Sequence, residues 1–389
     1  MLRLLISRCT GWLQALRRRI FSTSSVQETN IKDLIDRSDL SPIQLAKCIK
    51  SLKSTTQSPA EFEAIRNQLL PTEKREETDS ILYGLEQEDE FSILCRLMGT
   101  CESLLHLEQT PFLEERQEIP PDFVATFSPG CSVLGKSKND LELSYKCFVE
   151  VKSTKETVFK ISKRNLQRRQ NFANRYALPL MFAVRFTRLK GSALWLLMDA
   201  DSLQERNRRI AIDDFIESQR HVIFDDYFIM PLPHLHLARY YDSRSKKGGV
   251  YHKEYGDQVR SCLLLKEQWV EIHKDDAFFC NALLDTFDPH EVRIEKRENL
   301  TCQVLNIGIQ SRSLMDIIYR MNSLPVDKSE SRIYDPTRIV SRFDTNSGQK
   351  LIDRQLVESF LQSYKRVFFL ASFGEPEEQL AKLRALCGK

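Results

Sequence analysis

The sequence has no apolar run that approaches the length of about 18 residues expected of a membrane-spanning helix, so we predict no transmembrane segment. Its ten cysteines include no C-x-x-C pair, and no group of cysteines and histidines has the spacing of a zinc site. We therefore expect reduced, mostly buried thiols in an intracellular protein. The net charge of +3 is too small to indicate a nucleic-acid partner by itself, so the distribution of charge must decide.

Acidic residues are absent from the first 27 residues, where five arginines are interleaved with apolar residues and a serine-rich stretch follows. An Arg-rich, Ser-rich, acid-free amphipathic start is typical of a mitochondrial presequence and predicts the mitochondrial matrix for a eukaryotic protein. In a bacterial protein, which would be cytoplasmic, the same segment would be a basic helix on its own domain, on DNA or on a membrane surface. In either case it is no part of the predicted fold.

Acidic residues are also absent from residues 157–198, which contain nine basic residues. Residues 160–176 have helical spacing, and basic residues recur there at intervals of four and seven, so they should share one face of a helix. A solvated helix face would normally mix both signs of charge, so we predict that this face contacts a phosphate backbone. The residues of this basic stripe are Lys160, Lys163, Arg164, Arg168 and Arg175.

Two acidic residues and a lysine accompany two short apolar runs just before the basic stripe. Asp122 opens the run 122–127, and Glu150 and Lys152 stand at the end of the run 147–151. Because side chains alternate along a strand, Glu150 and Lys152 should point to the same face, and Asp122 can join them if the runs are neighbouring strands. Two carboxylates suit Mg²⁺, which usually also keeps waters and binds substrate phosphate. The lysine can orient or help to deprotonate the attacking water.

This pattern, Pro121-Asp122 followed after 27 residues by Glu150-Val151-Lys152, resembles the PD-(D/E)xK nuclease superfamily. The superfamily has the restriction-endonuclease-like fold and includes archaeal-type Holliday junction resolvases. The resemblance covers roughly residues 85–200, about a third of the chain. Within it, the order of expected elements is similar to the family core: strand 122–127, strand 147–151, helix 160–176 and strand 180–186.

The resemblance implies a metal-dependent endonuclease in which Asp122 and Glu150 ligate Mg²⁺, or Mn²⁺, and Lys152 positions the water. Many members add an acidic residue from the helix before the first core strand, and Glu90 or Glu102 could supply it, with Glu90 preferred. DNA is the implied substrate, and the choice among junctions, duplexes and single strands stays open, as do an RNA substrate and a homodimer. The alternative from another class is a catalytically silent DNA-binding or scaffold protein.

A chain of 389 residues is long enough for two domains, and we predict an α/β protein. Acidic residues gather between 73 and 90, which predicts a solvated face or a linker. Asp199 and Asp201 are expected to cap a helix or to form a turn rather than to bind metal. The predicted segments are a basic amphipathic segment at 1–27, a helical arm at 28–84, a restriction-endonuclease-like core with a mixed sheet flanked by helices at 85–205, and a C-terminal α+β domain of unknown role at 206–389.

Overall fold

The computed structural model of the chain describes residues 42–53, 59–69, 72–107, 118–135, 141–188, 194–245, 251–265, 268–273, 276–323 and 352–387. They belong to two compact units, Met1–Glu86 and Gln87–Lys389. The predicted targeting segment at 1–27 and the first part of the helical arm lie outside the described residues. No helix in the ranges above is long and apolar enough to cross a membrane.

The first unit is helical in its described part. It contains α3 (Pro42–Lys53), α4 (Pro59–Leu69) and the beginning of α5 (Thr72–Met98). Prolines open α3 and α4, at a position where no backbone donor is needed. The acidic stretch 73–90 is not a linker: it belongs to α5, which continues without a break for 27 residues. Glutamate is a good helix former, so a run of acidic residues does not end a helix.

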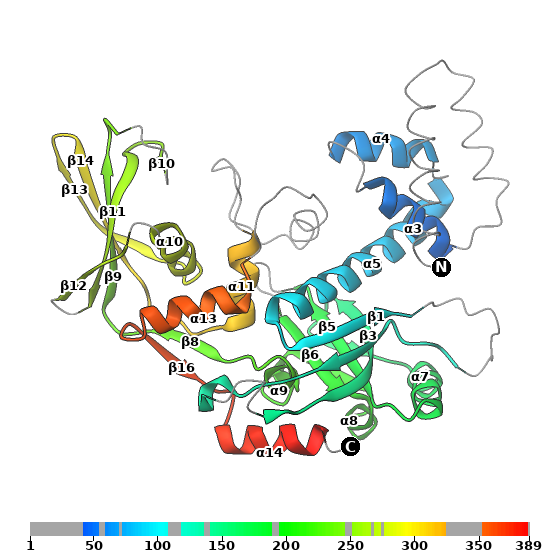
Figure 1. Cartoon of the computed structure of the whole chain (residues 1–389). Helices are drawn as coiled ribbons and strands as arrows, with labels where there is room; N and C mark the ends of the chain where they lie inside the picture. Colours follow the sequence, from blue (N-terminus) through cyan, green and yellow to red (C-terminus); the bar gives the residue numbers. More distant parts are fainter. Residues whose placement is uncertain are drawn as a thin grey trace. The chain divides into compact units, whose positions relative to one another are not determined.

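The second unit is built on a five-stranded mixed sheet with the strand order β1-β2-β3-β5-β6 (Figure 1). β3 and β5 are parallel and the other neighbours are antiparallel. The helix α7 (Lys163–Arg175) lies between the parallel strands in sequence, so the predicted order of strand, strand, helix and strand is present and the α/β class is confirmed. The strands are β1 (Cys101–His106), β2 (Phe123–Phe127), β3 (Tyr145–Thr154), β5 (Leu180–Phe186) and β6 (Leu194–Asp199).

Both faces of this sheet are covered. Side chains alternate along β3, so Val149 and Val151 enter one hydrophobic cluster and Phe148 enters another. The first cluster includes the end of α5 with Phe91, and the second includes α7 with Leu166. We call these two sides the α5 face and the α7 face. Because the central strands are buried on both faces, a charged side chain on either face needs a partner.

The remaining elements surround this sheet or form the C-terminal half of the unit. As predicted, Asp199 caps a helix, because its carboxylate accepts a hydrogen bond from Ser202 N at 2.8 Å. The elements are η1 (Ser132–Leu134), β4 (Val158–Lys160), α8 (Ala200–Glu205), β7 (Arg209–Ala211), η2 (Ile212–Phe215), α9 (Arg220–Ile223), β8 (Phe228–Pro231), β9 (Leu235–Asp242), β10 (Tyr251–His252), β11 (Gly256–Leu265), β12 (Gln268–Glu271), α10 (Ala277–Asp285), β13 (His290–Arg297), β14 (Leu300–Asn306), β15 (Arg312–Ser313), α11 (Leu314–Ser323), α13 (Arg354–Ser363), β16 (Phe368–Ala371) and α14 (Pro376–Cys387).

A second, six-stranded antiparallel sheet has the order β10-β11-β9-β14-β13, with β12 also paired to β11. One of its faces carries Leu237, Leu263 and Leu305, which join the same hydrophobic cluster as α10 and the α5 face of the first sheet. This cluster contains residues from both sides of 205/206, the predicted boundary between the core and the C-terminal domain. The two compact units do not divide at that position. The C-terminal half therefore shares its core with the first sheet.

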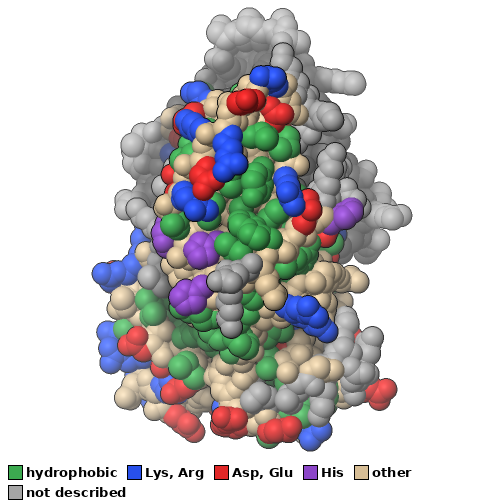
Figure 2. Space-filling view, turned by 90° about the vertical axis from the view of Figure 1, so that its left-hand side faces the viewer, with side chains coloured by type: hydrophobic (Ala, Val, Ile, Leu, Met, Phe, Trp, Pro, Cys, Tyr) green, Lys and Arg blue, Asp and Glu red, His purple; other side chains and the backbone are tan. Residues whose placement is uncertain are grey.

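The other face of the second sheet carries exposed hydrophobic side chains around a small buried centre. Ala238 and Cys262 form a small cluster of their own near its centre. Trp269 and Leu300 lie on the same face by strand register, and each is 49% exposed. Figure 2 shows that hydrophobic side chains gather on this side of the molecule. Within the described part of the chain, this face is thus partly exposed to solvent, as one face of an antiparallel sheet commonly is.

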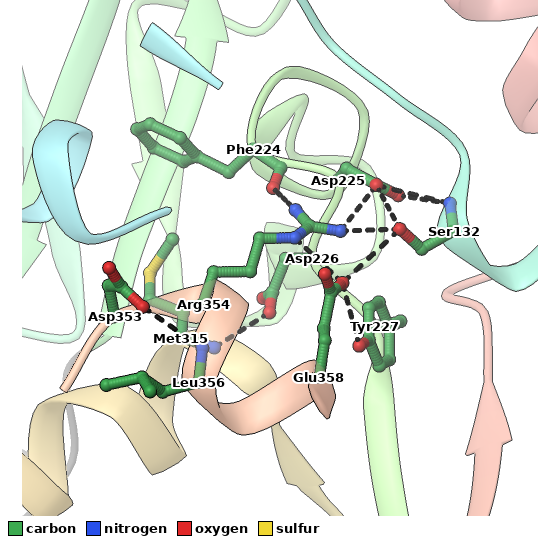
Figure 3. A network of polar contacts seen from close by, with 10 residues as sticks. All are labelled: Ser132, Phe224, Asp225, Asp226, Tyr227, Met315, Asp353, Arg354, Leu356 and Glu358. Carbon is green, nitrogen blue, oxygen red and sulfur yellow. Dashed lines mark hydrogen bonds and ion pairs between the residues drawn. The ribbon is translucent and has the colours of Figure 1, made fainter. Parts of the chain in front are cut away.

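A buried polar network joins α13 to the segment after β2 and to the segment after α9 (Figure 3). Arg354 donates to the carboxylate of Asp225 at 2.5 Å, to Phe224 O at 2.8 Å and to Ser132 Oγ at 2.7 Å. Its Nε also donates to Glu358 at 2.8 Å. Burial raises the pKa of Asp225, although Arg354 and Ser132 act to lower it. The guanidinium of Arg354 therefore compensates a buried carboxylate between segments far apart in the sequence.

We expect Arg354→Ala to lower the free energy of unfolding by about 3–5 kcal/mol, because it leaves a buried carboxylate without its cation. Lys382→Ala is a matched control, since Lys382 also pairs with a glutamate four residues away but does so at the surface. Lys382→Ala should lower the free energy of unfolding by less than about 1 kcal/mol. Urea unfolding measures both values, and equal losses in the two variants would contradict a stabilising role for the network.

Candidate active site

The structure brings Asp122, Glu150 and Lys152 together on the α7 face of the first sheet. Asp122 immediately precedes β2, and the antiparallel register of β2 and β3 places it beside Glu150. Asp122 Oδ2 accepts a hydrogen bond from Val151 N at 2.7 Å. Lys152 Nζ lies 2.5 Å from Glu150 Oε1 and 3.9 Å from Asp122 Oδ2. The predicted arrangement of these three side chains on one face is therefore found.

Both carboxylates are buried, with 1% exposure each. Burial and the charge of Glu150 raise the pKa of Asp122 to about 7, although Lys152 acts to lower it. Burial acts to raise the pKa of Glu150 as well, but Lys152 and Arg169 outweigh it and hold that pKa below its ordinary value. Burial acts to lower the pKa of Lys152, and the two carboxylates raise it above its ordinary value. At neutral pH Glu150 is ionised, Lys152 is charged and Asp122 is near its midpoint.

Arg169 completes this group, although it was not among the predicted site residues. It lies on α7, and its Nη2 is 2.6 Å from Glu150 Oε1. Helical spacing contains the signal that could have found it. Leu166 and Ala173 are buried against the sheet, and Arg169 lies three residues after the first and four before the second, which places it on the same face.

Glu150 Oε2, an acceptor, and Arg169 Nε, a donor, are buried and have no hydrogen-bond partner among the described residues. Glu150 Oε1 makes no hydrogen bond either, but it forms ion pairs with Lys152 and Arg169. A buried polar atom that stays unpaired costs free energy, so such atoms indicate a place for a ligand, a water or an ion. The acceptor suits a cation and the donor suits an anion.

The oxygen donors fit Mg²⁺ or Mn²⁺. Asp122 and Glu150 are hard ligands, and a cation would relieve the repulsion that raises the pKa of Asp122 in addition to burial. The part of the chain that the structure describes contains no group of three or more His, Cys, Asp and Glu side chains that could hold a metal ion. Two carboxylates suit an ion that also keeps waters and binds substrate phosphate.

Glu90 is not part of this group, so its prediction as a metal ligand is wrong. Glu90 is buried on the α5 face, where its Oε1 accepts hydrogen bonds from Arg185 Nε at 2.8 Å and Trp195 Nε1 at 3.0 Å. The sheet separates that face from Glu150. Glu90 therefore serves as the partner of a buried arginine.

Glu102 is also remote, because it is exposed at the end of β1 that pairs with the far end of β2. Glu88 is nearer, since its charge contributes to raising the pKa of Asp122. Its Oε2 lies 2.9 Å from Nε2 of His106, which stands at the end of β1 next to Asp122. Glu88 and Glu90 are two residues apart on a helix and so point to nearly opposite sides. Sequence alone did not show which side of α5 packs on the sheet.

The basic stripe is divided. Lys160 lies in β4, which pairs with β7, whereas α7 begins at Lys163. The prediction that Lys160 extends the helical row is therefore wrong. The reason is the side chain of Ser162, which accepts a hydrogen bond from Asn165 N at 3.2 Å and caps the helix.

Arg168 and Arg175 both reach Glu118. Arg168 donates to the backbone oxygen of Glu118 at 3.2 Å, and Arg175 pairs with its carboxylate at 2.9 Å. Lys163 and Arg164 are exposed in the first turn of α7, which has no acidic residue. A cation there opposes the helix dipole and costs about 0.3–1 kcal/mol. Helix stability therefore does not explain these two residues.

The raised pKa of Asp122 predicts a change of stability with pH. A carboxyl whose pKa is about 7 in the folded state and lower in the unfolded state weakens the fold as pH rises through that interval. Asp122→Asn keeps an acceptor for Val151 N and removes the charge. In EDTA we expect it to raise the melting temperature by several degrees at about pH 8, and by less towards about pH 5.

Scanning fluorimetry across this pH range checks the expectation. Glu102→Gln, which removes an exposed carboxylate, is the control and should change the melting temperature little at any pH. If the difference in melting temperature between Asp122→Asn and the wild type did not vary with pH, it would contradict the raised pKa of Asp122.

No family model and no curated protein matches the chain. Among solved structures, the chain is similar to a Holliday junction resolvase from the archaeal hyperthermophile Archaeoglobus fulgidus, with 16% sequence identity over 34% of this chain and 92% of that chain. The TM-score of 0.24 is too low for this likeness to carry an argument.

Proposed function

We propose that this chain is a metal-dependent nuclease of the PD-(D/E)xK type that hydrolyses phosphodiester bonds in DNA. The observation that carries the proposal is the pair of buried carboxylates, Asp122 and Glu150, beside Lys152 on one face of a sheet. Sheet packing does not require two adjacent buried acids. Burial and mutual repulsion raise the pKa of Asp122 to about 7, and perturbations of this kind cluster at functional sites.

Each of the three residues has a role in this proposal. Asp122 and Glu150 would hold Mg²⁺ or Mn²⁺, and the ion supplies Lewis acidity toward the phosphate and lowers the pKa of bound water. The two carboxylates raise the pKa of Lys152 against the effect of burial, so Lys152 keeps its proton at neutral pH. A protonated ammonium cannot accept a proton. Lys152 would therefore orient the attacking water as a hydrogen-bond donor.

The surface of α7 supports a nucleic-acid substrate. This helix packs on the face of the sheet that carries the carboxylates, and its first turn exposes Lys163 and Arg164. The phosphate backbone is the kind of anion that such cations bind without regard to sequence. DNA as the substrate and a homodimer stay predictions from the resemblance.

One observation favours a second candidate, a catalytically silent nucleic-acid-binding protein. Glu150 Oε1 already contacts two cations, Lys152 at 2.5 Å and Arg169 at 2.6 Å. An ion-pair cluster of this kind can compensate the buried carboxylate without a metal. The two candidates differ in one respect that can be measured: only the enzyme cleaves nucleic acid in a metal-dependent way.

We expect the wild type to cleave labelled DNA with Mg²⁺ or Mn²⁺ and not with EDTA. Asp122→Ala and Glu150→Ala should abolish cleavage and leave DNA binding largely intact, because each removes an oxygen ligand. Lys152→Ala should be equally inactive and still bind Mn²⁺, since an ammonium is not a metal ligand. The measurements are cleavage of junction, duplex, single-stranded DNA and RNA probes, and calorimetric titration with Mn²⁺.

Glu102→Gln is the control for these variants, because Glu102 is exposed at the far end of β1. It should keep both cleavage and Mn²⁺ binding. Full activity of Asp122→Ala or Glu150→Ala, with the fold preserved, would remove the proposed site. Cleavage of the RNA probes alone would replace DNA with RNA as the substrate.

The exposed cations of α7 give a second test. Replacing Lys163 and Arg164 together with alanine should weaken binding uniformly across sequences and flatten the slope of log K against log salt by about two, because each phosphate contact on duplex DNA contributes about 0.9. Arg175→Ala should change the slope less, since Arg175 is already paired with Glu118. Fluorescence anisotropy in EDTA measures these slopes. Unchanged slopes on duplex and single-stranded probes would exclude the first turn of α7 as a contact.

A further inference from the structure

Arg169 is the charged side chain of the site for which the proposed function gives no role. Its side chain is 12% exposed, and its Nη2 lies 2.6 Å from Glu150 Oε1. Its Nη1 makes a long contact of 3.4 Å with Asn165 O, and its Nε has no hydrogen-bond partner among the described residues although it is buried. A guanidinium has five N–H donors. Arg169 thus forms an ion pair through Nη2, whereas its Nε donor has no acceptor among the described residues.

Charge balance does not account for Arg169. Lys152 lies 2.5 Å from Glu150 Oε1, and one ammonium neutralises one carboxylate. Arg169 brings a second cation to the same oxygen atom, while its own Nε has no hydrogen-bond partner among the described residues. A buried donor without an acceptor suits an anion.

A divalent cation and Arg169 would compete for Glu150. Both attract the same carboxylate, and a doubly charged ion within a few ångströms repels a guanidinium strongly at low dielectric. Once displaced, the guanidinium would stay over the site, because the buried side chains of Leu166 and Ala173 fix α7 on the sheet. A planar guanidinium binds two phosphate oxygens at once, which an ammonium cannot do.

We propose that Arg169 binds the phosphate group of the substrate, and that Glu150 holds Arg169 in place until a divalent cation takes over the carboxylate. The inference rests on the proposed function and adds to it a residue that contacts the reacting phosphate. It predicts two effects of opposite sign. Arg169 weakens metal binding in the absence of substrate, and it accelerates cleavage by stabilising charge on the phosphate.

The first measurement is calorimetric titration with Mn²⁺ in the absence of nucleic acid. Arg169→Met keeps an extended apolar side chain and removes the charge. Its affinity for Mn²⁺ should exceed that of the wild type roughly tenfold, the equivalent of about one pKa unit for a removed neighbouring charge. Arg96→Met, the same substitution at an exposed position of α5, should leave the affinity unchanged. Thermal unfolding shows whether each variant keeps its fold.

The second measurement is single-turnover DNA cleavage at saturating Mn²⁺. Arg169→Met should be slower by a factor of roughly 10²–10³, as for other donors to a developing oxyanion. Arg169→Lys should recover part of the rate, because it restores a point charge without the bidentate geometry. A merely structural arginine would not give this result, since damage to the site lowers metal affinity and cleavage together.

A parallel fall of Mn²⁺ affinity and cleavage in Arg169→Met, or no change in either, would overturn the inference. Tighter Mn²⁺ binding with an unchanged rate would overturn the phosphate contact. Failure of the proposed function is seen separately, in the wild type. A wild type that shows no Mn²⁺-dependent cleavage of any probe would overturn both the proposed function and the phosphate contact, whatever the behaviour of the variant.

Discussion

An ionised carboxylate inside a sheet that is covered on both faces needs cations within reach, and this requirement organises the site. Glu150 is 1% exposed, and its compensation comes from two directions. Strand alternation supplies Lys152, two residues further along β3, and the covering helix supplies Arg169. The α5 face obeys the same rule with a different outcome, because Glu90 is compensated by Arg185 on β5. Each buried carboxylate is thus compensated by cations on its own face of the sheet. For this reason the two glutamates cannot bind one common ligand.

The strands and the placement of the three central residues could be predicted because their signals are local. Apolar runs at 122–127 and 180–186 mark buried strands, and alternation alone puts Glu150 and Lys152 on one face. The helix after them was also evident, but its first turn was not, because its start depends on a single capping hydrogen bond that Ser162 Oγ accepts from Asn165 N. For that reason Lys160 was assigned to the wrong element.

Other parts depend on how distant elements pack, and no local pattern carries that information. Glu88 and Glu90 stand in the same acidic stretch, and only the side of α5 that lies on the sheet separates them. The contact between Ser132 and Arg354 spans 222 positions of the chain. The core shared by the two sheets likewise joins segments on both sides of 205/206. The spacing of apolar residues indicates which face of a helix or strand is buried, but it does not indicate which element covers that face.

The antiparallel pairing of β2 with β3 also limits how the length of this chain can change in evolution. Asp122 and Glu150 meet in one register only, and a slip of one residue would turn one of the carboxylates to the opposite face of the sheet. Insertions and deletions within either strand are therefore incompatible with the site. The connection at 128–144 lies between the paired segments, so its length can vary while the register stays the same. In homologous chains the number of residues between the two acids is accordingly a poor guide to the site, and the strand pairing is a reliable one.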